Sequence, residues 1–264
     1  MTNIKSADVD KSTTKTTKEK DNKPLVSIVT VVYNGEKHLE ETILSVINQT
    51  YDHIEYIIID GGSTDATLEI IKKYEDAIDY WVSEKDAGIY DAMNKGIKRA
   101  SGEWINFMNA GDGFYSIDVL QKIFLKNDFL GIEVIYGNHN VVYPTKTRVV
   151  KAGNIEDIYK GSQFCHQSSF VSSKTHKINR FNLANKIGAD FEFFYNLYNK
   201  GLPFKYVDII VSNYCAGGLS DIKRVDSIVG CWNVVEKNTK VNLYYIWIIS
   251  KEMLKSWIKR VLLK

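Results

Sequence analysis

The 264-residue sequence has few cysteines, no long hydrophobic run and almost no net charge. Its three cysteines, Cys165, Cys215 and Cys231, form no CxxC spacing and leave one unpaired, which argues against a disulfide framework and a zinc site. The formal net charge of +2, from 34 basic and 32 acidic residues, gives no global field of the kind that nucleic-acid-binding proteins carry. We therefore expect a protein of a reducing compartment with no nucleic-acid partner.

Targeting and membrane-spanning segments are also missing from the sequence. The N-terminus has no apolar core of a secretory signal, and no window approaches the roughly 18 uncharged apolar residues of a spanning helix. Residues 1–23 contain six lysines, four acidic residues and no aromatic residue, and such a composition predicts a disordered tail. The remainder, in a chain that is 44% hydrophobic and 25% charged, predicts one globular, cytoplasmic domain with appendages.

Residues 24–114 alternate between strand-like and helix-like patterns. The first strand segment is a β-branched run too continuous for a strand with one wet face, so we expect it to be buried on both faces. The predicted strands are 25–33, 54–60, 80–83 and 104–108, and the predicted helices are 36–49, 66–74 and 89–100. This alternation predicts an α/β fold with a Rossmann-like, mostly parallel central sheet flanked by helices.

The second half is less regular, and we expect a mixed arrangement there. Strand patterns cover 132–143, 164–171 and 204–211, and a helix pattern covers 190–199. Polar residues follow the strands of the first half, namely Tyr33 and Asn34, Asp60, Ser83 and Glu84, and Asn109 to Asp112. Because ligands bind beyond the carboxyl ends of the strands in such sheets, we expect these residues to gather at one edge.

Four motifs in a fixed order carry a family resemblance. They are VVYNGEKHLEETILSVINQTY, IIIDGGSTDAT, DAGIYDAMNKGIKRASGEWINFMNAGD, and HQ followed downstream by GADFEFF. Together they resemble the family 2 glycosyltransferases of the GT-A fold, inverting enzymes that use nucleotide sugars to build bacterial surface polysaccharides such as lipopolysaccharide or capsule. The resemblance is close over about residues 25–114 and looser over 160–220, and it implies a GT-A domain over 24–240.

The resemblance implies a nucleotide-sugar site at the ends of the first two strands. Val31, Tyr33 and Asn34 would lie along the nucleotide, and Asp60 would accept hydrogen bonds from the uracil or ribose. The residues alone leave two alternatives open, with Asp60 as a turn or capping carboxylate and Tyr33 as a core aromatic residue.

Further donor contacts are implied for the segment that begins at residue 84. Asp86, Asp91 and Lys95 are its polar candidates. A solvated helix face also explains Lys95, because Lys95 and Arg99 stand four residues apart on one helical surface.

The family's usual Asp-x-Asp-Asp string reads Asn109-Ala110-Gly111-Asp112 in this chain. By resemblance the string binds Mg²⁺ or Mn²⁺ together with the donor diphosphate. Asp112 keeps the last carboxylate and is the expected metal ligand, since Mg²⁺ accepts one carboxylate plus phosphate oxygens and waters. Gly111 would let the backbone pass close to a sugar or phosphate, and Asn109 can still donate and accept hydrogen bonds. Asn109, Ala110 and Gly111 are therefore expected on the donor side of the site.

The resemblance also implies a general base at the start of a helix, and Asp190 matches that position. Glu192 is the rival, but side chains two residues apart on a helix face different directions, so only one of them should enter the site. The structural alternative for Asp190 is a carboxylate that stabilises the start of the helix through the helix dipole. His166, Gln167 and Arg224 are expected near the acceptor or the diphosphate, with a structural histidine and a simple turn as the alternatives.

The C-terminal residues 241–264 predict a basic amphipathic helix. Apolar residues recur at Ile246, Ile249, Met253, Trp257 and Val261, while five basic residues and one acidic residue give the segment from residue 244 a charge of +4. Such a helix suits the surface of an anionic membrane leaflet and predicts peripheral attachment to the inner face of the cytoplasmic membrane. The alternative is a terminal helix packed on the domain or on a second subunit of a homodimer.

The expected function is therefore that of an inverting glycosyltransferase of hexosyltransferase type. It would move a sugar from a nucleotide sugar, by default a UDP-sugar, to a hydroxyl of a glycan or a lipid-linked sugar. Two alternatives stay open on the residues. The altered carboxylate string suits a non-catalytic nucleotide-sugar-binding module, and a similar sheet also serves nucleotidyltransferases, although these need a Gly-rich basic loop where this chain has Tyr33-Asn-Gly-Glu36.

Overall fold

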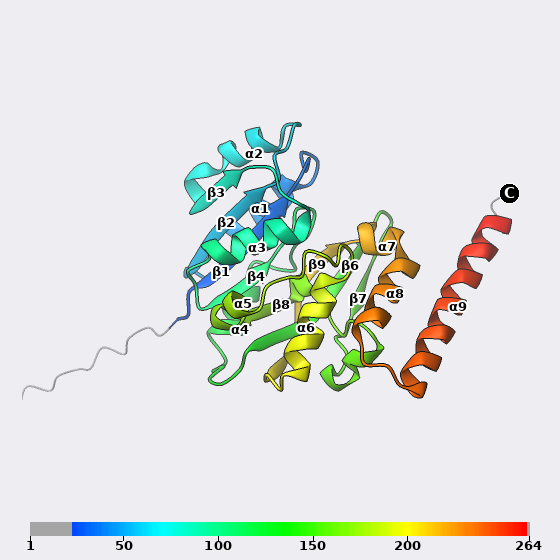
Figure 1. Ribbon diagram of the computed structural model, residues 1–264. Helices are drawn as coiled ribbons and strands as arrows, with labels where there is room; N and C mark the ends of the chain where they lie inside the picture. The colour runs from blue at the N-terminus through cyan, green and yellow to red at the C-terminus, as the bar shows by residue number, and fades with distance from the viewer. Residues whose placement is uncertain (1–22, 263–264) are drawn as a thin grey trace, which may run out of the picture.

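The computed structural model describes residues 23–262 (Figure 1). The disordered tail predicted for 1–23 lies outside the described residues apart from Lys23. The described chain forms a nine-stranded sheet of order β3-β2-β1-β4-β8-β6-β9-β5, with β7 paired to β6, and helices cover both of its faces. The α/β fold predicted from the sequence is confirmed.

The first half has the parallel arrangement that the strand and helix alternation predicts. Its strands are β1 (Val26–Val32), β2 (Ile54–Asp60), β3 (Tyr80–Ser83) and β4 (Trp104–Phe107). Its helices are α1 (Leu39–Ile47), α2 (Thr67–Lys73) and α3 (Ile89–Arg99), with the short 3₁₀ helix η1 (Glu75–Ala77) before β3. Every residue of β1 is buried, as expected for a strand covered on both faces.

Alternate residues of β1 feed two hydrophobic cores, one on each face of the sheet. Val29 and Val31 belong to the core that α3 covers, and Ile28 and Val32 belong to the core that α1 and α2 cover. Since successive side chains of a strand point to opposite faces, this division follows directly from the pleat.

The second half is mixed and curls back on the first. Its strands are β5 (Gly113–Phe114), β6 (Val134–Tyr143), β7 (Lys146–Val150), β8 (Ser169–Ser172) and β9 (Phe204–Cys215). Its helical elements are α4 (Val119–Phe124), η2 (Ile155–Lys160), α5 (Ser173–Ile178) and α6 (Ala189–Asn199). β8 is antiparallel to both β4 and β6, whereas β6 and β9 are parallel. The short β5 pairs with the far end of β9, which brings the loop after β4 to the end of β9.

One predicted strand begins later than its sequence pattern indicates. The pattern covers 164–171, but β8 starts only at Ser169, and His166–Ser168 forms the 3₁₀ helix η3. Local hydrogen bonds explain the turn, because the Ser168 amide donates to the Cys165 carbonyl and the Ser169 hydroxyl donates to the His166 carbonyl. The prediction that His166 and Gln167 lie on a strand is therefore wrong, and both residues sit in a tight turn.

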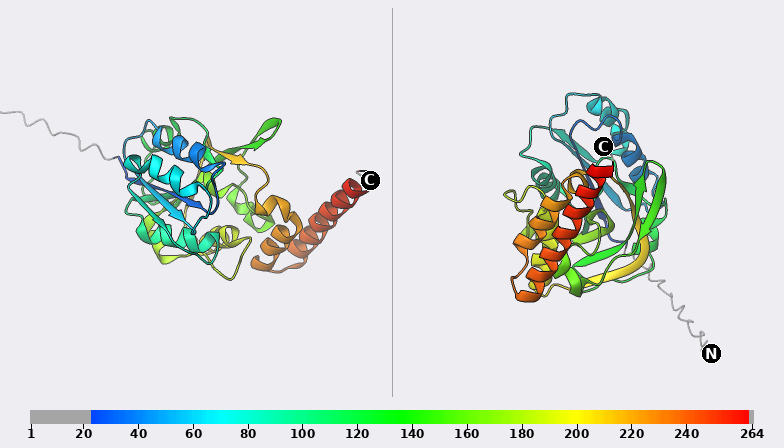
Figure 2. Two further views of the ribbon diagram at one scale, coloured as in Figure 1. Left: turned by 90° about the horizontal axis from the view of Figure 1, so that it is seen from above. Right: turned by 90° about the vertical axis from the view of Figure 1, so that its right-hand side faces the viewer.

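Three helices complete the chain, α7 (Leu219–Ile222), α8 (Arg224–Val234) and α9 (Thr239–Leu262). The start of α9 packs on α8, where Tyr245 is 1% exposed and its ring stacks on Trp232 with 6.0 Å between the ring centroids. The rest of α9 extends away from the body of the molecule (Figure 2). Among the described residues, no helix is long and apolar enough to cross a membrane.

The outer side of α9 is apolar along most of its length. Its exposed large hydrophobic residues are Leu243, Ile246, Trp247, Met253, Leu254, Trp257, Ile258 and Val261. Leu243, Trp247, Leu254 and Val261 recur at intervals of four and seven residues, so they share one face of the helix. Ile249, which the sequence pattern places on the apolar face, is partly buried against the core instead. Trp247 and Leu254 lie on the exposed apolar face, although the sequence pattern did not include them.

Candidate active site

The loops that follow β1, β2 and β3 are joined by hydrogen bonds at one edge of the sheet. The Asn34 amide nitrogen donates to the Ser63 hydroxyl at 2.7 Å, and the Asn34 Oδ1 atom accepts from the Thr64 amide at 2.9 Å. The Ser83 hydroxyl donates to Asp60 Oδ2 at 2.6 Å. The structure thus brings these polar strand ends together, as their positions in the sequence predict.

Asp60 organises the loop after β2 from a fully buried position. Its Oδ2 atom accepts hydrogen bonds from the amides of Gly62 and Ser63 as well as from Ser83, and its Oδ1 atom accepts from the Ser63 hydroxyl. These contacts correspond to the turn carboxylate that the sequence left open. A nucleotide could reach the Asp60 carboxylate only if this loop rearranged, and the nucleotide role of Asp60 stays a prediction.

Tyr33 lies at the end of β1 with 65% of its surface exposed, which excludes the alternative of a core aromatic residue. Val31, two residues earlier, is buried, and its carbonyl accepts a hydrogen bond from the Ala110 amide at 3.2 Å. The ends of β1 and β4 are therefore in direct contact. Tyr33 is free to present its ring to a ligand at this edge.

The polar residues between β3 and α3 mainly order their own loop. Asp86 Oδ1 accepts from the Gly88 amide at 2.8 Å, and Asp91 Oδ2 accepts from the Ala87 amide at 3.0 Å. The Lys95 ammonium group pairs with Glu84 at 2.8 Å, and this hydrogen bond raises the lysine pKa. The expected donor-site roles of Asp86, Asp91 and Lys95 stay predictions.

The segment Asn109–Asp112 forms a tight corner after β4. Gly111 has a φ of 99°, in the left-handed region that favours glycine, and its amide donates to the Thr42 hydroxyl at 3.0 Å. The Asp112 carboxylate accepts from the Gln167 side chain at 2.5 Å and from the Cys215 amide at 3.1 Å. Burial raises the pKa of Asp112, although these two donors oppose the shift.

The residues of this corner fit a divalent cation only in part. Among the described residues, no group of three or more His, Cys, Asp or Glu side chains is placed to hold a metal ion. Asp112 offers one carboxylate, and Asn109 Oδ1 is buried with no hydrogen-bond partner among the described residues. Both are hard oxygen ligands of the kind that Mg²⁺ and Mn²⁺ accept. Asp112 and Asn109 could therefore contribute to a cation site only together with ligands from a diphosphate and water.

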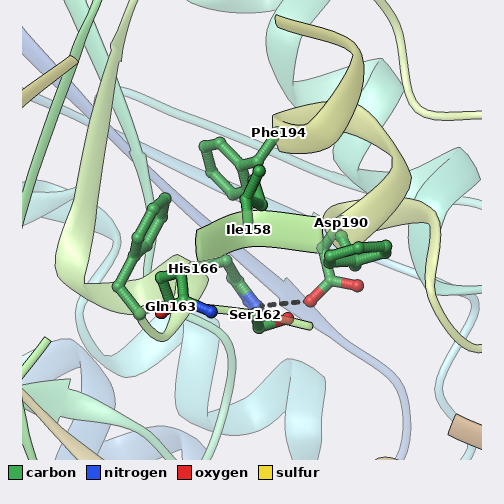
Figure 3. A pocket seen from close by; sticks show the side chains of 8 residues that line it. Ile158, Ser162, Gln163, His166, Asp190 and Phe194 are labelled. Carbon is green, nitrogen blue, oxygen red and sulfur yellow. Dashed lines mark ion pairs between the residues drawn. The ribbon is translucent and has the colours of Figure 1, made fainter. Parts of the chain in front are cut away.

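Asp190 meets His166 in the small cavity that Figure 3 shows. The Nδ1 atom of His166 lies 3.4 Å from Asp190 Oδ2, and its Nε2 atom lies 3.1 Å from Asn109 Nδ2. The Tyr90 hydroxyl donates to Asp190 Oδ1 at 3.0 Å. These contacts link four polar side chains in a row, here called the polar chain: Asn109 at the end of β4, His166 in η3, Asp190 in the first turn of α6 and Tyr90 in α3.

This polar chain keeps Asp190 ionised. Burial alone would raise the pKa of Asp190, but hydrogen bonding and charge interaction with His166 oppose that effect. The Phe191 amide and the Tyr90 hydroxyl also hold the pKa below its usual value. Asp190 is therefore a carboxylate at neutral pH.

Glu192 occupies a different environment from Asp190. Its two carboxylate oxygens accept hydrogen bonds from the side chains of Asn182 and Asn185, each at 2.9 Å. Glu192 therefore fastens the loop that precedes α6, whereas Asp190 faces His166 and Tyr90.

Comparison with known proteins decides the family. Residues 27–195 match the model described as glycosyl transferase family 2, which is more than half of the chain. The chain belongs to this family. Among curated relatives of this glycosyltransferase, the PGL/p-HBAD biosynthesis glycosyltransferase of Mycobacterium bovis is 29% identical over 208 residues, which cover 75% of this chain and 80% of that protein. An uncharacterized glycosyltransferase of Mycobacterium tuberculosis is 35% identical over 176 residues, covering 64% of this chain and 67% of that protein.

Solved structures share the fold of this glycosyltransferase at low sequence identity. The structure of S. aureus TarS 1-349 in complex with UDP has a TM-score of 0.62 at 18% identity, covering 83% of this chain and 69% of that chain. The mannosyltransferase PcManGT from Pyrobaculum calidifontis, in complex with GDP-Man and Mn²⁺, also has a TM-score of 0.62, at 16% identity and with coverage of 84% and 67%. These neighbours support the GT-A fold.

Sequence reasoning missed one residue of the site of this glycosyltransferase. Tyr90 lies within the motif DAGIYDAMN and reads as an ordinary helix residue, yet its hydroxyl reaches a carboxylate 100 positions away. No spacing in the sequence carries that contact. The structure also places Arg224, an expected acceptor or diphosphate contact, at the start of α8.

Proposed function

We propose that this family 2 glycosyltransferase catalyses an inverting transfer of a hexosyl group from a nucleotide sugar to an acceptor hydroxyl. The observation that supports the proposal best is the position of the Asp190 carboxylate between His166 and Tyr90. It lies beside the Asn109–Asp112 corner through the His166 ring. A proton acceptor next to a diphosphate corner is what a single displacement requires.

In the proposed mechanism, Asp190 takes the proton of the acceptor hydroxyl as the oxygen attacks the anomeric carbon. The bond between that carbon and the diphosphate oxygen breaks on the opposite side, so the configuration inverts. His166 orients the Asp190 carboxylate, and Tyr90 donates a hydrogen bond to its other oxygen. Gln167 holds Asp112 at the corner where the diphosphate departs.

We propose that the donor is a UDP-sugar and that a divalent cation accompanies it. The related structures named above bind UDP in one case and GDP-Man with Mn²⁺ in the other. In this chain Asp112, with Asn109 beside it, would hold the cation together with the donor diphosphate, and the bound cation would neutralise the charge of the leaving diphosphate. Tyr33, Asn34, Asp60, Asp86, Asp91 and Lys95 are proposed on the donor side.

We further propose that α9 lies on an anionic membrane surface at the inner face of the cytoplasmic membrane. Its exposed apolar face carries Trp247 and Trp257, and Lys240, Lys251 and Lys255 accompany it on the same helix. Apolar burial and attraction of lysines to anionic lipids act together at such a surface. The natural acceptor is then a glycan or lipid-linked sugar of surface polysaccharide biosynthesis. A second copy of the chain is the alternative occupant of this face.

A panel of nucleotide sugars tests the proposed donor. We expect one nucleotide sugar to raise the thermal unfolding temperature, with a larger rise when Mn²⁺ is present, and to release nucleoside diphosphate on turnover. The family match already disfavours the nucleotidyltransferase alternative, for which pyrophosphate release would be diagnostic. Binding of a nucleotide sugar without any turnover would instead identify a non-catalytic binding module.

A further inference from the structure

An open cleft lies between η2, α8 and the start of α9. Its volume is about 380 Å³, and its lining includes Lys160, Arg224, Tyr244 and Tyr245. The small cavity that contains His166 and Asp190 shares Ser162 and Gln163 with this cleft. The two cavities therefore adjoin at these two residues, and the cavity at Asp190, of about 10 Å³, has room for a single hydroxyl group.

The charges at the cleft favour an anion. Lys160 is the last residue of η2, and its Nζ atom lies 2.6 Å from Asp157 Oδ1. Because Asp157 also lines the cleft, the charge of Lys160 is partly compensated there. Arg224 is exposed and makes no hydrogen bond or ion pair within the part of the chain that the structure describes. An arginine with its five N–H donors unused is well suited to a phosphate, which it binds through paired hydrogen bonds.

The tyrosines suggest that the anion is attached to a sugar. Tyr244 is half-buried at the cleft, and an aromatic ring offers a flat apolar face to a sugar ring. The Tyr245 hydroxyl is buried and has no hydrogen-bond partner among the described residues, although Tyr245 lines the cleft. A buried hydroxyl normally has a partner, so a ligand hydroxyl or phosphate oxygen would satisfy it.

The charges of Asp190 and Arg224 both act on Cys231, which lines this cleft. Burial raises the pKa of the Cys231 thiol to about 12, the Asp190 charge adds to that shift, and the Arg224 charge opposes it. Cys231 itself lines the cleft. Both charges therefore act on one thiol, which agrees with the shared lining of the two cavities.

We propose that the cleft is the acceptor subsite and that it recognises a saccharide bearing a phosphate group. Arg224, helped by Lys160, binds the phosphate, the sugar ring lies against Tyr244, and the Tyr245 hydroxyl donates to the ligand. The nucleophilic hydroxyl then points past Ser162 and Gln163 toward Asp190. This assignment rests on the proposed glycosyltransferase function and names the class of its acceptor.

Calorimetric binding of glucose 1-phosphate and of methyl glucoside tests the subsite without turnover. Saturating UDP and Mn²⁺ keep the phosphate probe out of the donor site. We expect Arg224→Ala to weaken glucose 1-phosphate binding by about tenfold or more, since it removes charge-assisted hydrogen bonds, and to leave methyl glucoside unchanged. Tyr245→Phe should weaken the probe by about threefold to tenfold while keeping the fold, because its hydroxyl has no partner to lose.

The matched control is Lys126→Ala, an exposed cation just after α4 that lines neither cavity. Equal affinities for Arg224→Ala and Lys126→Ala would overturn the subsite, and so would the absence of glucose 1-phosphate binding in the presence of saturating UDP. A decyl ester of the glucosyl phosphate separates two sources of the phosphate. Binding at least about tenfold tighter than glucose 1-phosphate indicates a lipid-linked acceptor, and equal binding indicates a soluble phosphorylated glycan.

The binding assay tests the phosphate-binding subsite, and the donor assay tests the transferase function, so a negative result in one does not decide the other. A wild-type protein that releases no nucleoside diphosphate with any donor contradicts the proposed function, whereas the affinity of the cleft for glucose 1-phosphate is measured by itself. If the wild type turns over a donor but shows no preference for glucose 1-phosphate over methyl glucoside, the phosphate-binding subsite is wrong and the transferase proposal stands.

Discussion

The Nδ1 atom of His166 lies 3.4 Å from the Oδ2 atom of Asp190, although one residue belongs to the turn before β8 and the other to the first turn of α6. The same imidazole reaches Asn109 at the end of β4 through its other nitrogen. Within the part of the chain that the structure describes, His166 therefore connects the proposed base to the proposed diphosphate corner. Substitutions of the residues around this connection test the proposed mechanism.

Tyr90→Phe tests the hydrogen bond that Tyr90 donates to the proposed base, Asp190. The variant removes the hydroxyl that donates to Asp190 Oδ1, so the carboxylate loses both orientation and stabilisation of its charge. We expect kcat to fall about tenfold with little change in the donor KM. Tyr74→Phe is the matched control, because the Tyr74 hydroxyl donates to Glu40 far from the site, and it should leave kcat unchanged. Equal rates for the two variants would remove Tyr90 from the mechanism.

The pH dependence of stability tests the charge state of Asp190. Because the pKa of Asp190 is lowered on folding, its ionised form stabilises the fold above the ordinary aspartate pKa, and this contribution is lost as the pH falls through the lowered value. Asp190→Asn lacks the titration. In urea unfolding, the stability of the wild type relative to this variant should therefore be larger near pH 7 than at strongly acidic pH. A difference that grows on acidification would show that Asp190 is protonated in the folded state.

Asp112→Asn tests the proposed cation and diphosphate corner. The variant keeps the side-chain size and removes the one carboxylate of the corner, so we expect a loss of Mn²⁺-dependent turnover of at least about a hundredfold. Asp118→Asn is the control, since Asp118 also has two donors, in this case the side chains of Ser116 and Lys122 on the surface. Full activity of Asp112→Asn would make the corner an ordinary glycine-rich turn.

The membrane proposal for α9 needs substitutions rather than deletion, because Tyr245 at its start is part of the core. Trp247→Ser, Leu254→Ser and Trp257→Ser together remove apolar surface only from the exposed face. We expect this triple variant to lose cosedimentation with vesicles of phosphatidylglycerol while its unfolding temperature is unchanged.

A control triple variant carries serine at three other exposed apolar positions, Leu125, Leu130 and Ile178. It should sediment with the vesicles like the wild type. If the α9 variant still sediments but changes from dimer to monomer in solution, the exposed face binds a second copy of the chain instead of a membrane.

Much of the first half of the fold could be predicted from the sequence. The bounds of β2 and β3 agree with the predicted 54–60 and 80–83 because β-branched and aromatic runs stop sharply at polar or glycine residues. Local patterns also identified Asp190 at a helix start and Asn109 to Asp112 at a strand end. Family motifs supplied their expected roles.

The second half depended on contacts that no local pattern carries. β5 has only two residues and pairs with β9 about a hundred positions away, so its place is fixed by tertiary structure. Gln167 reaches Asp112 only because η3 turns the chain where the apolar pattern predicts a strand. The cleft around Arg224 likewise needs three separate elements, and sequence spacing alone could not place it.

The stereochemistry of the product tests the single displacement. Attack by a hydroxyl that Asp190 activates gives the anomeric configuration opposite to that of the donor, and NMR of the purified product shows it directly. A retained configuration would require two successive displacements and would contradict the mechanism.

The central claim, that Asp190 is the general base, is tested most directly by the kcat of Asp190→Asn for nucleoside diphosphate release. We expect a loss of about 10² to 10⁴ with the donor KM nearly unchanged, because an amide cannot take the proton of the acceptor. Glu192→Gln, measured beside it, should stay within a few fold of the wild type, since Glu192 only fastens a loop. A kcat for Asp190→Asn within a few fold of the wild type would contradict the account.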